Sequence, residues 1–212
     1  MIMIRKERAK IFEEYLTEKY PVVVCSLNFQ TPFQLLTATI LSAQCTDARV
    51  NIVTKDLFAA YPDAFALADA DIPDVEKLIK STGMYKMKSK NIVNMAKALV
   101  ENHGGEVPQK MDELLALAGV GRKTANVVRG NLWKKPGVVV DTHVKRIAKR
   151  IGLTNNTDPE KVEKDLEKII KGENHCNWCH RVIYFGREIC NARSPKCEKC
   201  GVTHACKYYS SL

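Results

Sequence analysis

The chain has 212 residues, 45% of them hydrophobic, and a formal net charge of +9. This length is enough to bury a sizeable core in one large domain or two small ones, and the composition excludes an intrinsically disordered protein. The positive charge suits a polyanionic partner such as nucleic acid.

No run of apolar residues is long enough to cross a membrane, and the first four residues are followed at once by Arg5 and Lys6. We therefore expect neither a membrane span nor a secretory signal. A chain that stays in the reducing cytoplasm would use its eight cysteines for metal binding rather than for disulfides.

Helical periodicity recurs along the whole chain. It predicts a first helix over 4–20 and a second that begins at Thr31-Pro32, a typical helix start. The buried face of the second helix should consist of Phe33, Leu36, Ile40 and Ala43. Further helices are predicted after Thr46, between Asp71 and a left-handed cap at Gly83, around 92–99, after Asp141, after Asp158 and over about 176–190. Strand alternation is almost absent, so the predicted fold is all-α.

The turn over 118–121 is the most informative stretch, because helical spacing flanks it on both sides. Gly119 and Gly121 allow positive φ and a close backbone approach, and Val120 between them can turn inward as an anchor. The free N–H groups at the start of the following helix would then form a binding site for a backbone phosphate, without contacts that distinguish one base from another. Lys123 on this helix start favours that interpretation over an ordinary helix corner.

Residues 117–128 resemble the helix-hairpin-helix of the endonuclease III family of DNA glycosylases. The resemblance covers essentially the whole chain, with the hairpin at about 111–132. It implies a helical barrel domain over 23–136 and a second helical domain formed by 1–22 with 137–212, with the active-site cleft between them. It also implies damaged double-stranded DNA as the partner, and we expect a monomer in the cytoplasm of a bacterium or archaeon, on its nucleoid.

In that family the lysine at the position of Lys123 is the catalytic nucleophile. Its amine attacks C1′ of the nucleotide, and the Schiff base left on the opened sugar permits β-elimination of the 3′ phosphate. Arginine stays protonated and cannot serve, whereas lysine can if its pKa falls by roughly three units from about 10.4. We expect burial, the helix N-terminus and the neighbouring Arg122 to lower it.

Asp141 follows an apolar run and precedes a predicted helix, so the ordinary expectation is an N-cap. The resemblance implies that it also lies across the cleft from Lys123, where it stabilises the developing sugar cation and helps to move protons. Both roles are compatible, because one carboxylate oxygen can cap the helix while the other faces the sugar. His143, one turn further on, is expected to be a packed residue rather than a base.

Four cysteines lie past the last predicted helix, with six, two and five residues between them: Cys190, Cys197, Cys200 and Cys206. Four thiolates this close in sequence can hold an iron–sulfur cluster or a zinc ion. A rival set replaces the first and last of them by Cys176 and Cys179, which gives the spacing of a zinc ribbon, and spacing alone leaves both sets open. Cys176 and Cys179 fall on a predicted helix, where cysteine commonly packs as a small apolar residue. The six-two-five spacing is the family's cluster pattern, so the resemblance implies a [4Fe–4S] cluster on the first set.

The remaining predicted contacts are with DNA. A flipped nucleotide leaves a gap in the duplex, and by resemblance Gln44 fills it while Met84, at a leucine-like position, wedges into the opposite strand. The basic residues that follow the wedge, Lys86, Lys88 and Lys90, suit the phosphate backbone. Arg193 and Lys196 flank Pro195 in the cysteine loop, which would present a cationic surface to phosphates.

Lysine at position 123 distinguishes this chain from the adenine-excising and thymine-mismatch relatives, which carry serine and tyrosine there. It implies the bifunctional branch, which removes oxidised pyrimidines of the thymine glycol type and then cuts 3′ of the abasic site. Two other classes fit the sequence. A non-enzymatic helix-hairpin-helix scaffold would bind duplex DNA without any dependence on Lys123, and a zinc-bearing nucleic-acid adaptor would be colourless.

Overall fold

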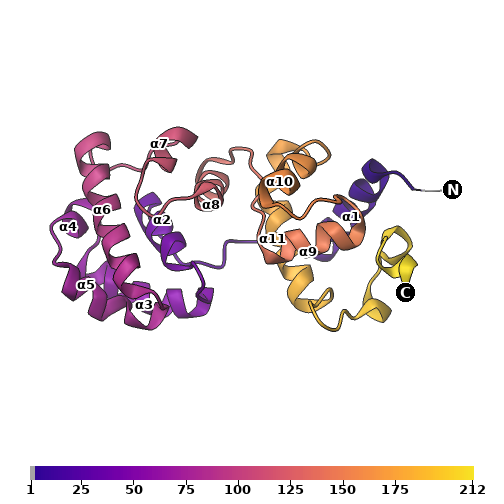
Figure 1. Ribbon diagram of the computed structural model, residues 1–212, viewed down its shortest axis with the longest axis horizontal. Coiled ribbons are helices and arrows are strands. Elements are labelled where there is room, and N and C mark those ends of the chain that lie inside the picture. The colour runs from indigo at the N-terminus through magenta and orange to yellow at the C-terminus, as the bar shows by residue number, and fades with distance from the viewer. Residues whose placement is uncertain (1–2) are drawn as a thin grey trace. The chain divides into compact units, whose positions relative to one another are not determined.

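The structure, a computed structural model, describes residues 3–212, and those residues contain helices and no strand (Figure 1). The predicted all-α fold is therefore confirmed. Met1 and Ile2, which belong to the N-terminal segment where no secretory signal is expected, lie outside the described residues. Within the described residues no helix combines the length and the apolar character that crossing a membrane would require.

The chain divides into two compact units: Cys25–Trp133 is continuous, and the other unit combines the chain up to Val24 with Lys134–Leu212. The continuous unit contains α2 (Pro32–Leu41), α3 (Asp47–Ala60), α4 (Ala64–Ala68), α5 (Ile72–Ile79), the 3-10 turn η1 (Lys80–Thr82), α6 (Tyr85–His103), α7 (Met111–Leu115) and α8 (Arg122–Trp133).

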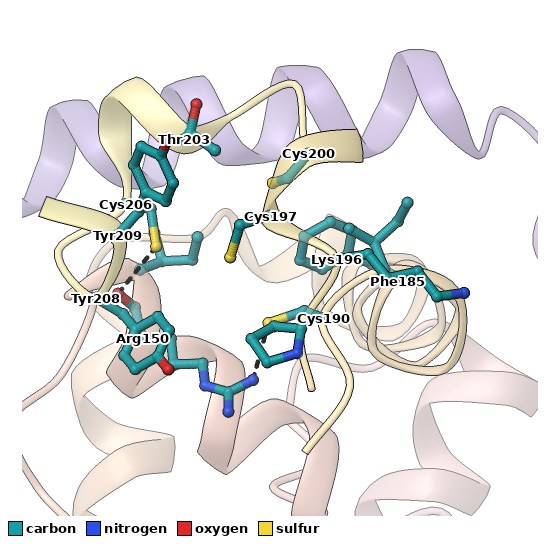
Figure 2. A pocket seen from close by; sticks show the side chains of 13 residues that line it. Arg150, Phe185, Cys190, Lys196, Cys197, Cys200, Thr203, Cys206, Tyr208 and Tyr209 are labelled. Carbon is teal, nitrogen blue, oxygen red and sulfur yellow. Dashed lines mark hydrogen bonds between the residues drawn. The ribbon is translucent and has the colours of Figure 1, made fainter. Parts of the chain in front are cut away.

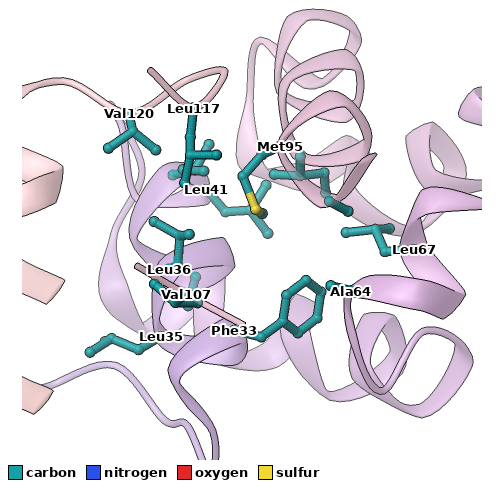
Figure 3. Packing of buried hydrophobic residues seen from close by; sticks show 14 of the residues in the cluster. Phe33, Leu35, Leu36, Leu41, Ala64, Leu67, Met95, Val107, Leu117 and Val120 are labelled. Atoms are coloured by element: carbon teal, nitrogen blue, oxygen red, sulfur yellow. The ribbon is translucent and has the colours of Figure 1, made fainter. Parts of the chain in front are cut away.

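Helix α2 is the centre of the continuous unit. Thr31 caps it by accepting a hydrogen bond from the backbone N–H of Gln34, and every residue from Leu35 to its last residue, Leu41, is buried. A helix that is apolar all round must be covered all round, and α3, α6 and α8 pack against this one. Figure 3 shows side chains of α2 in the same apolar cluster as Leu117 and Val120 of the hairpin.

Two predicted details of this unit are wrong. Ala43 is exposed, because α2 ends at Leu41 and the chain turns away from the buried face. Gly83 ends the 3-10 turn η1 rather than an α-helix, and its φ of 71° with ψ of 155° lies outside the left-handed helical region.

The discontinuous unit contains α1 (Arg5–Lys19), α9 (Thr142–Ile151), α10 (Pro159–Glu167), η2 (Gly172–Asn174), α11 (His175–Glu188), η3 (Cys197–Lys199), η4 (Thr203–Ala205) and η5 (Tyr209–Ser211). Its core joins the N-terminal helix to the C-terminal part of the chain. Phe12 of α1 meets Trp178 and Phe185 of α11 edge to face, at centroid distances of 6.4 and 5.4 Å. These ring contacts stabilise the unit across more than 160 residues of sequence.

Candidate active site and cysteine centre

The predicted hairpin consists of α7, the turn and α8. Val120 is 7% exposed and packs into the core of the continuous unit, as predicted for an anchor. Gly119 has a φ of 77°, and a Cβ on it would lie 3.0 Å from Cβ of Asn91, so only glycine fits there.

Gly121 does not have the positive φ that was predicted for both glycines of the turn. A Cβ added to it would meet no atom within 4 Å. The backbone at the start of α8 is therefore not crowded by the protein, which leaves room for an external group.

Lys123 is the second residue of α8 and is exposed. The expected burial of this lysine is therefore wrong, because the first turn of α8 faces away from the core that Ala125 and Val128 enter. The start of α8 still provides the positive end of a helix dipole and the adjacent cation Arg122. An exposed amine at this point is accessible to a substrate.

Asp141 caps α9, as predicted. Its Oδ1 accepts a hydrogen bond of 2.7 Å from the backbone N–H of Val144, while Oδ2 takes no part in the cap. The residue is half-buried, and Val138, three residues earlier, is buried in the core of the discontinuous unit. Val138 and the partly buried Val139 and Val140 pack against this core and fix the backbone that presents the carboxylate.

His143 is a packed residue, as expected. Its Nδ1 lies 3.2 Å from Nη2 of Arg146, and a Cβ on Gly186 would approach the same nitrogen to 2.5 Å. Burial lowers the pKa of His143, and Asp141 opposes that shift. Arg146 also donates to the carbonyl oxygen of Cys190, which connects α9 to the start of the cysteine loop.

All four predicted ligands line one cavity (Figure 2). Burial raises the pKa of the Cys200 thiol, and the other three thiols of the set raise it further. Four thiolates within reach of one another need a positive centre to compensate their charge. No three His, Cys, Asp or Glu side chains among residues 3–212 converge closely enough for a single metal ion. Four cysteines that line one cavity are a donor set that an iron–sulfur cluster can use.

The rival pair lies elsewhere in the unit. Cys179 is buried in the core, where its Sγ accepts a hydrogen bond of 3.3 Å from the backbone N–H of Val139. Burial raises the pKa of Cys179, so this thiol stays protonated and packs as an apolar group. Neither it nor Cys176 lines the cavity of the other four cysteines.

Sequence reasoning missed Arg150 of α9 at the cysteine cavity. Its guanidinium donates to the carbonyl oxygens of Asn191 and Ala192, at 2.7 and 2.8 Å, and lies 4.9 Å from the ring centroid of Tyr208. No motif identifies such a residue, because its partners are backbone atoms about 40 positions away. Arg193 and Lys196, in the same loop, are both exposed.

The two residues predicted to enter DNA share a rare backbone conformation. Gln44 and Met84 have φ of 53° and 47°, and both side chains are exposed. Among the described non-glycine residues only Lys134 also has positive φ. Such conformations are costly for residues with a Cβ and concentrate at functional sites.

Lys88 is not the phosphate contact that the run of lysines indicates. It is 1% exposed, and its Nζ donates to the carbonyl oxygens of Leu41 and Thr82. The signal was present in the sequence, because Lys88 precedes Ile92 by four residues and so lies on the apolar stripe of α6. Lys86 and Lys90 are exposed, as expected.

Comparisons with known proteins give a consistent result. Residues 37–172 match the model of the HhH-GPD superfamily of base excision DNA repair proteins. The chain is 52% identical to endonuclease III of Synechocystis, over 95% of this chain and 93% of that one. It is 40% identical to endonuclease III of Bacillus subtilis, over 97% and 94% of the two chains.

A solved structure of a trapped endonuclease III–DNA covalent intermediate superposes with a TM-score of 0.93 and 40% identity, over 99% of both chains. A thermostable thymine-DNA glycosylase superposes with a TM-score of 0.86 at 23% identity, which supports the fold.

Proposed function

Since the chain belongs to the HhH-GPD superfamily of base excision DNA repair proteins, we propose that it is a bifunctional enzyme of the endonuclease III type. The chain is a DNA glycosylase of base excision repair. The finer proposal is that it removes oxidised pyrimidines from duplex DNA and then cuts 3′ of the abasic site through a lysine Schiff base.

One observation carries this proposal: an exposed amine, Lys123, in the first turn of the helix that follows the hairpin. The open backbone at Gly121 and the helix N-terminus favour a phosphate there. A phosphate bound at that turn would bring the adjoining sugar to the amine. The amine then attacks C1′, the base leaves, and the resulting iminium acidifies the 2′ position for elimination of the 3′ phosphate.

Asp141 supplies the complementary group. Its Oδ1 is used by the cap of α9, so the carboxylate is held by the backbone while Oδ2 faces the sugar in our proposal. A fixed negative charge stabilises the positive charge that develops on the sugar and accepts a proton during the attack.

We assign a [4Fe–4S] cluster to the set of cysteines that lines the cavity of Figure 2: Cys190, Cys197, Cys200 and Cys206. When bound, the cluster supplies a folding constraint on the loop rather than chemistry on the sugar. The exposed cations Arg193 and Lys196 are then presented to DNA phosphates.

Damaged double-stranded DNA is the proposed substrate of a monomeric enzyme. Gln44 and Met84 would occupy the gap left by the flipped nucleotide, and the hairpin would hold the backbone without reading sequence.

Borohydride trapping tests this function. Wild-type protein is incubated with duplexes that contain thymine glycol, an abasic site or no lesion, and borohydride reduces any Schiff base to a stable covalent adduct. We expect an adduct and 3′ cleavage on the first two duplexes and none on the third. If the protein binds all three duplexes without forming an adduct or cutting, the lyase proposal is wrong and the scaffold hypothesis replaces it.

A further inference from the structure

Lys88 is a buried cation that joins two parts of the continuous unit. Its side chain is 1% exposed, and Nζ donates hydrogen bonds of 2.9 Å to the carbonyl oxygen of Leu41 and 2.8 Å to that of Thr82. Leu41 is the last residue of α2 and Thr82 the last residue of η1. Carbonyl groups at helix ends lack partners within the helix, and they attract a positive charge.

Each of these carbonyls lies just before one of the two strained residues. Gln44 follows Leu41 by three residues, and Met84 follows Thr82 by two. The backbone N–H of Lys88 also donates to the carbonyl oxygen of Met84, at 3.0 Å. That bond belongs to the first turn of α6 and does not depend on the side chain. What the lysine itself contributes is the pair of Nζ hydrogen bonds to the backbone just before the two turns.

Packing alone does not explain a lysine at this position. It lies on the stripe of α6 that Ile92, Met95 and Leu99 continue, and methionine would fill a similar volume without the cost of burying a charge. Burial lowers the pKa of Lys88, as expected for a cation that loses its hydration. What lysine offers and methionine lacks is three donors on a flexible stem that reaches two carbonyls at once.

Both anchored residues have a backbone conformation that they would leave if they were free. Positive φ is unfavourable for glutamine and methionine, so the two turns persist only while surrounding contacts hold them. A side chain that enters a base stack must be presented in a fixed direction, because ordering it during binding would weaken the complex.

We propose that Lys88 is a positioning residue for DNA intercalation, which holds the Gln44 and Met84 turns in the conformation that fills the gap. The inference rests on the proposed function, in which those two side chains enter the duplex. The proposal gives Lys88, a buried residue, an indirect role in nucleotide flipping.

The test uses Lys88→Met, with Lys97→Met as the matched control, since Lys97 is an exposed lysine of the same helix. Flipping is measured with a fluorescent base beside an abasic analogue, and borohydride trapping is measured on duplex and on single-stranded abasic DNA. We expect Lys88→Met to reduce flipping and duplex trapping on the order of tenfold, the size expected when buried carbonyls lose their donor. Trapping on single strands, which leave no gap to fill, should not change.

Hydrogen exchange separates positioning from general instability. The positioning role predicts faster exchange at residues 42–45 and 82–85, with the rest of α2 and α6 protected as in the wild type. Lys88→Arg, which keeps charge and donors, should recover flipping. If Lys88→Met does not fold, Lys88→Gln keeps a donor but is one bond shorter, and it should show the same duplex-specific loss.

Wild-type flipping in the Lys88→Met or Lys88→Gln variant would overturn the inference, as would an equal loss on single strands and duplexes. Failure of the underlying function looks different, because the wild type itself would then trap no abasic DNA.

Discussion

Arg150 contacts both the first and the last cysteine of the cavity. Its Nη1 donates to Sγ of Cys190 at 3.4 Å, and the backbone carbonyl oxygen of Arg150 accepts from Sγ of Cys206. Arg150 belongs to α9, the helix whose N-terminus is capped by Asp141. The cysteine centre and the proposed catalytic carboxylate are therefore attached to the same ten-residue helix. If the proposed cluster orders the loop, the hydrogen bond from Arg150 to Cys190 connects that order to the helix whose N-terminus Asp141 caps.

The first prediction concerns the metal. Purified protein should be brown and contain iron and acid-labile sulfide in equal amounts, and Cys197→Ser should lose the colour and fold poorly, because the cavity then lacks one ligand. Absorbance, metal analysis and thermal unfolding check this.

Cys176→Ser is the matched control, because Cys176 does not line the cavity, and it should keep both colour and stability. Stoichiometric zinc in colourless, active protein would contradict the cluster assignment.

The second prediction separates the two glycines of the hairpin. Gly119→Ala should destabilise the protein by about 1–3 kcal/mol, because an L-residue at its φ of 77° is strained and its Cβ would press on Asn91. Gly121→Ala should destabilise the protein less, by no more than about 1 kcal/mol, because its Cβ would enter open space and the only cost is that alanine is a poorer N-cap than glycine. Urea unfolding measures both.

The same pair distinguishes fold from binding. Gly121→Ala should weaken duplex binding measurably, since the added methyl group occupies the approach to the N-terminus of α8. If both variants lose equal stability and Gly121→Ala binds DNA as the wild type does, the start of α8 is not the phosphate-binding site.

Much of the fold is local and could be predicted from the sequence. The starts of α2 and α3 follow from Thr31 and Thr46, which both accept the predicted capping hydrogen bonds. Periodicity also located buried positions of α2, since Phe33, Leu36 and Ile40 are all buried. Such features depend on neighbours within one or two turns.

The features that could not be predicted depend on contacts between residues that are distant in the sequence. The periodicity of α6 indicates that Lys88 is buried, but only the fold shows what the buried amine binds, because its partners at Leu41 and Thr82 come from two other elements. Arg150 was missed because its partners are carbonyls of a loop. Burial of Lys123 was expected because its proposed reaction needs a neutral amine. Whether the side chain is buried is decided instead by the direction in which the first turn of α8 faces.

The third prediction concerns the flipped nucleotide. Gln44→Ala and Met84→Ala should each weaken binding to a lesion-containing duplex far more than to a single strand, because only a duplex leaves a gap to fill. A fluorescent base beside the lesion should report a smaller flipping amplitude in both. Ile52→Ala removes a similarly exposed apolar side chain, from α3, and should behave as the wild type. Unchanged flipping in both variants would mean that Gln44 and Met84 only terminate their turns.

The last prediction concerns the reaction itself. Lys123→Gln keeps a polar side chain of similar length but removes the nucleophile, so borohydride trapping and base excision should both vanish while binding to the damaged duplex survives. An adduct that persists in this variant would identify another amine as the nucleophile.

Asp141→Asn completes the same experiment and has its own internal control. Asparagine is as good an N-cap as aspartate, so the start of α9 and the thermal stability should be unchanged. Turnover should nevertheless fall by about 10²–10³-fold, since the variant loses the charge that stabilises the sugar cation and the group that accepts a proton. Single-turnover excision on a thymine glycol duplex measures the rate, and binding should match the wild type. If the rate falls only in proportion to a loss of stability, Asp141 is a helix cap and the carboxylate that assists Lys123 must be sought elsewhere.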